Sequence, residues 1–464
     1  MKRLGVWSIE DKKANDHPIT TTWVFKVKRD HNDKIVEHKA RLCAQGFHQI
    51  EGLDYLNTFS PTGRVSSLRV LIAHAASQGF QFHQMDVKSA FLNAPLEEDL
   101  TLKIPDGLNK DSKSKVLRLH KAIYGLKQAP LAWYKYLLKW LKNTGFVVAV
   151  SDPCVFFRKG IKPVWIYVHV DDLAIFGPDL LDFKTEIKNS FEMKDLGEAS
   201  LLLGIKITHI NNGFTLSQEH YINTLAREYD LEKYSPVNTP LKPNLQLNNA
   251  TKEEEAEFAN LNINYRSAIG ALNYISTNTR PDITFAVLRY LYHTKDLSLH
   301  YSKEGNKGIE AYADADWGNW VIDRRSTSGY IVTVNGHLVS WRTKKQPTVS
   351  HSTTEAEYKA LSNMTKEVEW LMQLLKEINV NTENSTPQFF NNNKGAIDLA
   401  LSNANHNGFK TKHMDIIYHY IRDLIRNSVI NLKYISTNFM AADFLTKSVG
   451  KTILLRSRRF LNLY

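Results

Sequence analysis

The sequence predicts a multidomain protein of the α+β or α/β class, in which helices and strands are mixed. The chain has 464 residues, which corresponds to about three domains of ordinary size. Its composition, 43% hydrophobic and 23% charged, is typical of a globular protein with a sizeable core. Segments with the two-residue period of strands alternate with segments of helical spacing.

The first half of the chain reads as strands and helices in alternation. In 66–78, apolar residues recur at the spacing of a helix: Leu68, Leu71, Ile72 and Ala75. Asp171 and Asp172 fall between two apolar strands, which predicts a β-hairpin. The predicted strands are 22–28, 35–42, 82–87, 164–170, 173–176 and 201–210, and the predicted helices are 66–78, 127–142 and 181–190.

A polar stretch at 242–259 is the best candidate for an interdomain linker. Beyond it, 308–341 alternates apolar and polar residues as strands do, and 354–378 is a long amphipathic helix. A short strand at 388–390 and a helix at 410–427 follow. The chain ends in a small basic tail that contains four cations and no acid.

Composition excludes several classes of protein. Two cysteines, Cys43 and Cys154, are too few for a disulfide scaffold or a cysteine-based zinc site, and the count fits a reducing compartment. No run of 18 apolar residues exists that could span a bilayer, and the charged start is not a secretory signal. Lysine and arginine outnumber the acids by 59 to 48, a net charge of +11 that favours nucleic acid as partner.

Three aspartates carry the most informative chemical pattern. Asp86 ends one predicted strand, and Asp171 and Asp172 lie in the later hairpin. Nucleotidyl transfer requires carboxylates that hold two divalent cations roughly 3.5–4 Å apart. One carboxylate from a strand and two from an adjacent hairpin suit that geometry, although an acidic pair after an apolar strand is more often a solvated turn.

The surrounding motifs resemble the reverse transcriptase of copia-type LTR retrotransposons. The resemblance covers most of residues 7–245 and implies a right-hand polymerase of fingers, palm and thumb. Five stretches carry it in order: KARLCAQGFHQIEGLDY (39–55), QMDVKSAFLNAPLEEDL (84–100), LHKAIYGLKQAPLAWY (119–134), YVHVDDLAIFG (167–177) and DLGEASLLLGIKI (195–207).

The resemblance implies roles for individual residues. Asp86, Asp171 and Asp172 match the metal-binding triad, and Lys39 and Arg41 match the fingers residues that hold the incoming triphosphate. Alternate residues of one strand share a face, so both cations can reach one polyphosphate.

Other matched positions line the nucleotide and primer sites in the family. Phe91 matches the ring beneath the sugar that excludes a 2′-hydroxyl, although a core aromatic is an equal alternative. Gln128, with Gly125, Lys127 and Pro130, matches the template and nucleotide-pocket loop. Leu202, Leu203 and Gly204 match the primer-positioning turn, although a plain turn is the alternative.

The chain also departs from the family pattern. His169 replaces a usual tyrosine that contacts the primer end, and Leu131 replaces an arginine expected near nucleic acid. Gly63 stands where a branched apolar residue is usual, and Ala94-Pro95 replaces Gly-Asp. None of these changes removes a metal ligand.

The second half resembles the RNase H domain that follows copia-type polymerases. Asp314 matches the first of four metal-binding carboxylates, Glu357 the second with Glu355 as alternative, and Asp443 the last with Asp415 as alternative. Asn392 stands where the third carboxylate is expected, which predicts weak metal binding and poor or absent cleavage. The motifs are IEAYADADWGN, DRRSTSGY, SHSTTEAEYKALS, KTKHMDIIYHYIRDLI and NFMAADFLTK.

These matches predict the domain organisation. We expect reverse transcriptase fingers and palm at 1–245, a thumb and connection at 246–307, an RNase H-like mixed-sheet domain at 308–447, and the basic tail at 448–464. The connection is expected to be short, because a helical segment of the family pattern is missing after Val287. No protease or integrase pattern precedes these motifs, so the chain resembles a fragment or remnant of an element.

The family implies an RNA-directed DNA polymerase with an attached, impaired RNase H domain. Mg²⁺, or Mn²⁺ in its place, is the implied cofactor of its two-metal sites, since oxygen-rich sites prefer hard cations. The implied partners are an RNA template, a DNA primer or RNA–DNA hybrid, and deoxynucleoside triphosphates, in virus-like particles of the cytoplasm or in the nucleus. The alternative is an inactive remnant that binds nucleic acid without catalysis.

Overall fold

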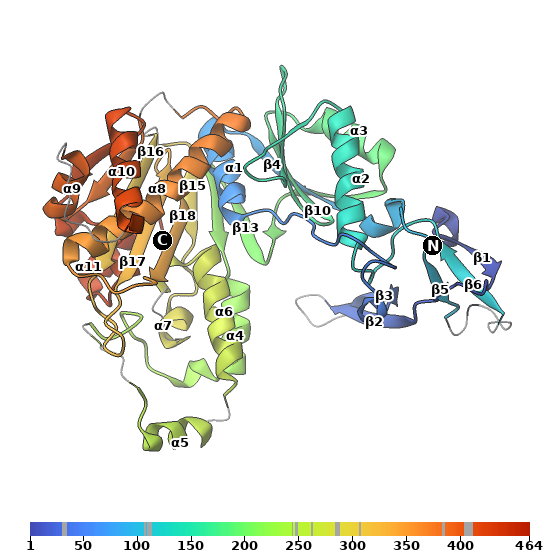
Figure 1. Ribbon diagram of the computed structural model, residues 1–464, viewed down its shortest axis with the longest axis horizontal. Helices are drawn as coiled ribbons and strands as arrows, with labels where there is room; N and C mark the ends of the chain where they lie inside the picture. Colours follow the sequence, from blue (N-terminus) through green and yellow to red (C-terminus); the bar gives the residue numbers. More distant parts are fainter. Residues whose placement is uncertain are drawn as a thin grey trace. The chain divides into compact units, whose positions relative to one another are not determined.

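The structure of the protein is a computed structural model (Figure 1). Two compact units make up the chain: one comprises Met1–Arg64 and His83–Gly197, the other Val65–Phe82 and Glu198–Tyr464. No helix among the described residues is long and apolar enough to cross a membrane. The described residues are 1–29, 35–105, 108, 114–243, 245, 249–260, 263–283, 288–305, 308–382, 386–402 and 412–464.

The first unit is built on a six-stranded sheet of order β11-β4-β10-β9-β8-β7. Its core is one continuous cluster of buried apolar side chains, to which β9, β10, α2 and α3 all contribute. The elements are β4 (Gln81–Val87), α2 (Ala129–Asn143), β7 (Val147–Val148), β8 (Val155–Arg158), β9 (Val164–His169), β10 (Asp172–Gly177), α3 (Leu181–Ser190) and β11 (Met193–Glu198).

Two smaller sheets complete the first unit. A hairpin of β2 (Thr21–Arg29) and β3 (Ile35–Ala44) confirms the predicted pair of strands. The other sheet has the order β1-β6-β5 and is formed by β1 (Trp7–Asp11), β5 (Thr101–Lys103) and β6 (Lys115–Leu119).

The second unit combines α1 (Val65–Gln78) with the chain beyond residue 197. A four-stranded sheet of order β12-β13-β14-β15 lies in it, and α1 packs against β14, β15 and β18. The strands and helices of this part are β12 (Leu201–Leu202), β13 (Ile205–Ile210), β14 (Gly213–Ser217), α4 (Glu219–Glu228), α5 (Lys252–Asn260), α6 (Tyr265–Asn278), α7 (Leu288–His293) and β15 (Leu299–Ser302).

A five-stranded mixed sheet of order β18-β17-β16-β19-β20 forms the rest of the second unit. Its first three strands are antiparallel, whereas β16, β19 and β20 run parallel, and α8 packs across β16 and β17. The elements are β16 (Ile309–Asp316), β17 (Thr327–Val334), β18 (His337–Lys345), α8 (Thr353–Glu377), β19 (Gln388–Asn391), α9 (Lys394–Leu401), α10 (Lys412–Arg426), β20 (Asn431–Tyr434) and α11 (Lys451–Phe460).

The predicted fold class is confirmed: helices and strands are mixed in both units, and the five-stranded sheet of the second unit is mixed. The polar linker candidate contains α5, which buries none of its residues, as an exposed connection would. The basic tail is packed rather than free, because Leu463 forms a bridge with Leu299 at the edge of β15. The predicted domain boundaries stay predictions, and Val287, where the family helix is missing, lies outside the described residues.

Candidate active sites

The hairpin that carries Asp171 has a strained turn. His169 pairs with Asp172 across β9 and β10, which leaves Val170 and Asp171 as a two-residue loop. Val170 has φ 59°, a left-handed conformation that is unusual for a β-branched residue and costs about 1–3 kcal/mol. The indole of Trp133, on α2, donates a hydrogen bond of 2.7 Å to the carbonyl oxygen of Val170 and so holds the turn in place.

Asp86 and Asp171 meet in one cavity. The backbone amide of Val87, next to Asp86, donates to the carbonyl oxygen of Asp171 at 2.9 Å, which joins the end of β4 to the hairpin turn. Both aspartates line a cavity of about 540 Å³ together with Lys39 and Arg41 of β3. The structure therefore brings together four residues that the sequence places up to 132 positions apart.

Asp172, the next residue along the chain, is half-buried and does not line this cavity. Burial raises the pKa of Asp172, the hydrogen bond from Gln84 opposes that rise, and the charge of Asp171 adds to it. The Nε2 of Gln84 donates to Oδ1 of Asp172 at 3.1 Å. The repulsion between neighbouring carboxylates is what a divalent cation would relieve.

Tyr124 is a site residue that sequence reasoning missed. Its ring lines the cavity, and the guanidinium of Arg41 lies 5.2 Å from the ring centroid. Burial raises the pKa of Tyr124, and the charges of Asp171 and Asp86 raise it further. In the sequence, the feature that could have indicated this role is the position of Tyr124 in the stretch IYGLKQAP, which also contains the matched loop residues Gly125, Lys127 and Gln128.

Phe91 and Gln128 do not line the cavity that holds Asp86. The Phe91 ring packs behind Tyr124 with 5.0 Å between ring centroids. Gln128 is buried and donates from Nε2 to the carbonyl of Asp54 at 2.9 Å. Its Oε1 accepts from Nε2 of Gln49 at 3.0 Å, so it joins the loop after β3 to the start of α2.

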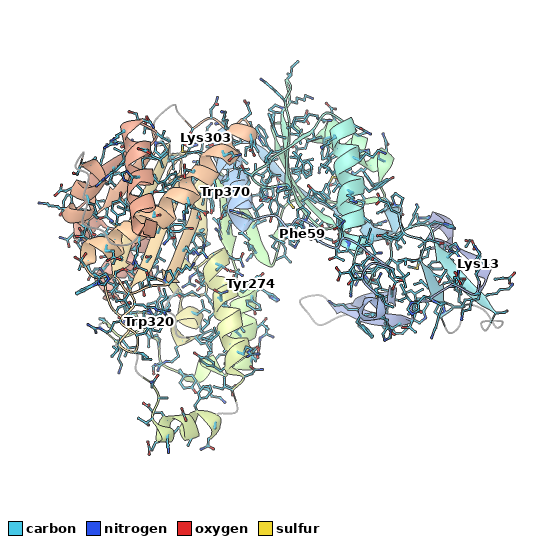
Figure 2. All side chains as sticks on the ribbon, in the orientation of Figure 1. Lys13, Phe59, Tyr274, Lys303, Trp320 and Trp370 are labelled. Atoms are coloured by element: carbon cyan, nitrogen blue, oxygen red, sulfur yellow. The ribbon has the colours of Figure 1, made fainter. Side chains whose placement is uncertain are left out.

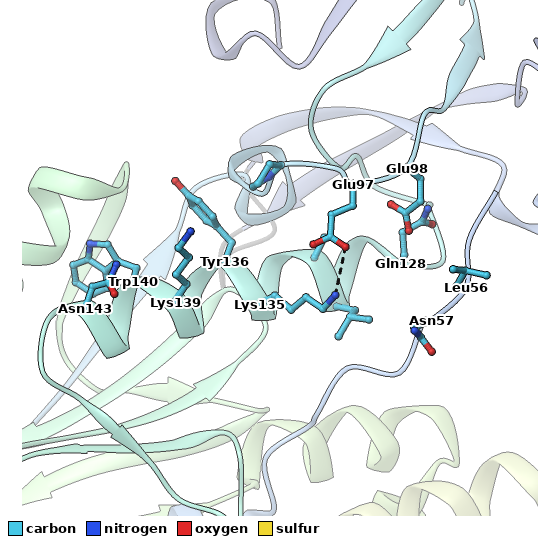
Figure 3. Close-up of a pocket in the computed structure, with 13 residues that line it drawn as sticks. Leu56, Asn57, Glu97, Glu98, Gln128, Lys135, Tyr136, Lys139, Trp140 and Asn143 are labelled. Carbon is cyan, nitrogen blue, oxygen red and sulfur yellow. Dashed lines mark ion pairs between the residues drawn. The ribbon is translucent and has the colours of Figure 1, made fainter. Parts of the chain in front are cut away.

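Gln128 instead lines a second cavity of about 640 Å³ along α2 (Figure 3). Lys135, Tyr136, Lys139 and Trp140 project into it from successive turns of the helix. Acidic residues lie on its other side, where Oε2 of Glu97 is 3.7 Å from Nζ of Lys135. This groove combines cations with aromatic and apolar surface. Leu131, one of the departures from the family, also lines it.

The departure at Gly63 has a packing reason. The carbonyl oxygen of Gly63 accepts a hydrogen bond of 2.9 Å from the hydroxyl of Tyr167, a buried residue of β9. A Cβ at position 63 would lie only 2.5 Å from Cε2 of the same ring. The Tyr167 ring therefore occupies the space that a branched side chain at position 63 would need.

The predicted RNase H carboxylates gather in the second unit. Asp314 on β16, Glu357 on α8 and Asp443 in the turn after β20 are all buried. Nζ of Lys447 lies 2.9 Å from Oδ1 of Asp443 and 3.8 Å from Oδ2 of Asp314. The hydroxyl of Thr446 also donates to Asp314.

The carboxylates of this cluster repel one another. Burial raises the pKa of Glu357, and the charge of Asp314 raises it further. The same two causes, in the same order, raise the pKa of Asp443. Burial and the charge of Asp314 also raise the pKa of Asp316, which the charge of Lys447 lowers. Asp316, two residues after Asp314 on β16, was not among the predicted ligands.

At the position of the missing carboxylate, Asn391 rather than Asn392 contacts the cluster. The fully buried Asn391 donates from Nδ2 to Oε2 of Glu357 and to the carbonyl of Ala313, each at 3.0 Å. The half-buried Asn392 donates to the hydroxyl of Thr437 at 3.4 Å.

The alternative ligand Glu355 has a structural role at the start of α8. Its backbone amide donates to Oγ of Ser352 at 3.1 Å, and its carboxylate accepts from the amide of His351 at 2.9 Å. It also pairs with Lys359 at 2.8 Å. The side chain of Asp415, on α10, lies outside the described part of the chain.

Neither cluster is arranged as a finished metal centre. No three His, Cys, Asp or Glu side chains within the described ranges are placed to hold a metal ion. The donor chemistry nonetheless fits a hard divalent cation, because both clusters consist of carboxylates. Burial and a neighbouring carboxylate raise the pKa of Asp172 in the first cluster and of Glu357 and Asp443 in the second.

Comparison with known families gives one long match. The family model described as reverse transcriptase (RNA-dependent DNA polymerase) matches residues 4–243, about half of the chain. A transposon Ty5-1 protein of Saccharomyces cerevisiae is 31% identical over 61% of this chain and 100% of its own length.

Two plant relatives match almost the whole chain. The Pol polyprotein from transposon TNT 1-94 of Nicotiana tabacum is 35% identical over 97% of this chain and 36% of its own length. The Pol polyprotein from transposon RE1 of Arabidopsis thaliana is 35% identical over 93% of this chain and 31% of its own length. The chain thus spans about a third of the length of these relatives.

A solved structure was also found. The foamy viral protease-reverse transcriptase in complex with RNA/DNA hybrid is 11% identical, with a TM-score of 0.45, over 93% of this chain and 52% of its own.

Proposed function

We propose that this chain, which belongs to the reverse transcriptase family of copia-type Pol polyproteins, is an RNA-directed DNA polymerase. It would extend a primer on an RNA or DNA template with deoxynucleoside triphosphates. The observation that carries the proposal is the cavity in which Asp86 and Asp171 face Lys39 and Arg41. Carboxylates opposite cations are the arrangement that phosphoryl transfer requires.

Asp86, Asp171 and Asp172 are the residues that would hold Mg²⁺ or Mn²⁺. When bound, such ions activate the attacking hydroxyl and neutralise the leaving group. In the transfer, the primer 3′-hydroxyl loses its proton to solvent and its oxygen bonds to the α-phosphorus. The bond between the α-phosphorus and the oxygen that bridges it to the β-phosphorus breaks, and pyrophosphate leaves. Lys39 and Arg41 would bind the β- and γ-phosphates and neutralise the charge that builds up on pyrophosphate.

Two neighbours would keep the cations and carboxylates in place. Tyr124 presents its ring to Arg41 and so limits the positions that the guanidinium can take. Trp133 holds the carbonyl of Val170, so Asp171 stays at the tip of a rigid hairpin. Both contacts organise the site before substrate binds, which lowers the cost of reaching the transition state.

The groove along α2 suits the template strand. Lys135 and Lys139 can neutralise backbone phosphates, and Tyr136 and Trp140 offer flat surfaces to unpaired bases. The acidic Glu97 and Glu98 limit the net positive charge of the groove. Leu131 adds apolar surface where the family pattern has an arginine.

For the second unit we propose an RNase H-like site with weak or absent cleavage. Asp314, Glu357 and Asp443 would provide three carboxylates, and Asn392 contributes no charge. Losing one anion from a site for two cations weakens the binding of at least one of them. The alternative for the whole chain, an inactive remnant that binds nucleic acid, is favoured by the same asparagine and by Lys447, which already pairs with Asp443.

The test is primer extension on oligo(dT)-primed poly(rA) with dTTP and Mg²⁺ or Mn²⁺. Asp171→Asn/Asp172→Asn should abolish extension while leaving template binding and folding intact. Asp182→Asn is the matched control, because this carboxylate is exposed on α3 away from the cavity. A folded parent that binds template–primer without extending it would overturn the polymerase proposal and leave the remnant.

A further inference from the structure

The turn between β12 and β13 places a leucine in a left-handed backbone conformation. Leu202 pairs with Ile205, so Leu203 and Gly204 form a two-residue loop. Both are left-handed, with φ 52° and φ 69°, as in a type I′ turn. Such turns favour Asn-Gly, because few residues other than glycine and asparagine adopt this conformation readily. Leucine at the first position therefore needs support from outside the hairpin.

Tyr274 gives that support from α6 (Figure 2). Its hydroxyl donates a hydrogen bond of 2.6 Å to the carbonyl oxygen of Leu203. Burial raises the pKa of Tyr274, so the hydroxyl keeps its proton and remains a donor. The ring of Tyr221, on α4, packs edge-on against Tyr274 at 5.3 Å between centroids and fixes its direction.

Gly204 and Tyr274 fit each other closely. A Cβ at position 204 would clash with the hydroxyl oxygen of Tyr274, and the next atom of that ring, Cζ, would be 3.5 Å away. The glycine is thus needed both for its backbone conformation and for the approach of the hydroxyl. The turn and the tyrosine form one fitted unit.

The catalytic hairpin uses the same device. There Val170 is left-handed, and an aromatic donor, Trp133, binds its carbonyl oxygen. That strained turn presents Asp171 to the nucleotide cavity. Backbone strain that the surroundings hold in place is concentrated at functional sites. Because both turns are strained and both are held by an aromatic hydrogen-bond donor, we infer that the position of the Leu203–Gly204 turn also matters for function.

We propose that Tyr274 is a positioning residue for the reverse transcriptase reaction: it fixes the Leu203–Gly204 turn so that its backbone can contact the primer strand. This rests on the proposed polymerase function. Gly204 is exposed and has no side chain, so a sugar–phosphate backbone can approach the peptide groups closely. Lys206, two residues on, is exposed and carries positive charge beside the turn.

Tyr274→Phe removes the hydroxyl and keeps the ring, so it tests the hydrogen bond alone. We expect the Kd for a primer–template duplex to rise roughly fivefold, which corresponds to the loss of one ordinary hydrogen bond. The KM for dTTP at saturating primer–template should stay unchanged, since Lys39 and Arg41 bind the triphosphate. Tyr265→Phe is the matched control, because this tyrosine is exposed at the start of the same helix.

Gly204→Ala gives a second, independent test through rescue. With Tyr274 present, the new methyl group meets the hydroxyl, and the Kd should rise more than tenfold. In Gly204→Ala/Tyr274→Phe the clash is removed, so the alanine should raise the Kd for primer–template less than it does when Tyr274 is present. Leu203→Asn restores the favoured Asn-Gly turn, and in that background Tyr274→Phe should raise the Kd less than twofold.

The outcomes separate the two proposals. A parent that neither extends primers nor binds them contradicts the polymerase function itself. A parent that binds primer–template, while Tyr274→Phe and Tyr265→Phe bind equally well, overturns the role of Tyr274. Additive costs of the Gly204 and Tyr274 substitutions would also overturn it, and thermal unfolding of each variant verifies that it is folded.

Discussion

The ammonium group of Lys447 lies 2.9 Å from Oδ1 of Asp443 and 3.8 Å from Oδ2 of Asp314. It is thus placed between two of the carboxylates that would hold a divalent cation in the second unit. Asp443 and Asp314 are almost completely buried, whereas the side chain of Lys447 is 36% exposed. Lys447 therefore compensates part of the negative charge of the cluster, and its exposed side chain has room to move away.

Lys447→Met should make the metal-free protein less stable and its response to metal stronger. The variant leaves buried carboxylates without their counter-ion. We expect this to lower the free energy of unfolding by about 1–2 kcal/mol, a value between those typical of breaking exposed and buried ion pairs. Thermal unfolding with EDTA and with Mn²⁺ measures both effects, in a background that carries Asp171→Asn/Asp172→Asn.

Lys345→Met is the control for this substitution. Lys345 forms an ion pair of 2.8 Å with Asp323 at similar exposure. Lys345→Met should lower the melting temperature slightly and leave the change in melting temperature on adding Mn²⁺ as in the parent. An equal Mn²⁺ response in Lys447→Met and the parent would contradict the idea that lysine and metal compete for one place.

The metal-free protein should lose stability as the pH rises. Burial and the charge of Asp314 raise the pKa of Glu357 above its ordinary value of 4.5. The folded state then binds more protons than the unfolded state, so this contribution is complete below pH 4.5 and is lost as the pH rises toward the raised value. Urea unfolding with EDTA from pH 5 to pH 8 measures the slope.

Glu357→Gln removes the titrating group and should flatten this slope. Glu369→Gln, at a half-buried position of the same helix where the carboxylate accepts from Tyr420, should leave the slope as in the parent. If Glu357→Gln and the parent lose stability in parallel across this range, Glu357 is not the group responsible.

Asn392→Asp should raise cleavage of an RNA–DNA hybrid by the full chain. The substitution returns the fourth carboxylate, and we expect a gain of roughly ten- to hundredfold, the range typical of changes around a metal site. Asn391→Asp should do the opposite, since Asn391 donates to Glu357 and an aspartate there would repel it. Strong metal-dependent cleavage by the parent would show that Asn392 is no impairment.

Arg41→Ala should raise the KM for dTTP by roughly tenfold or more, because a hydrogen bond to a charged phosphate is lost. The Kd for primer–template should change little, so the two constants separate the nucleotide site from the duplex site. Lys162→Ala removes a cation paired with Asp179 and should leave both constants unchanged. A rise in the duplex Kd alone would assign Arg41 to the nucleic acid instead.

Much of the local structure could be predicted from the sequence. The hairpin at Asp171 and Asp172, the long helix that carries Glu357 and the paired strands around Lys39 all follow from the period of apolar residues. Period and turn composition are local properties, so one sequence reveals them. The place of Phe91 behind Tyr124 was not predictable, because two aromatic residues compete for the same space and packing decides between them.

The sequence by itself determined which chemical groups this protein has: the aspartates, the strand with two cations, and the asparagine where a carboxylate was expected. Only the tertiary structure decided which of them meet. Val87, next to Asp86, donates a backbone hydrogen bond to Asp171, which is far away in the sequence. Asn391 rather than Asn392 reaches Glu357, and Lys447 pairs with Asp443. The reason is physical: residue types and their spacing are set along the chain, whereas contacts across a sheet and burial of charge depend on how its elements pack.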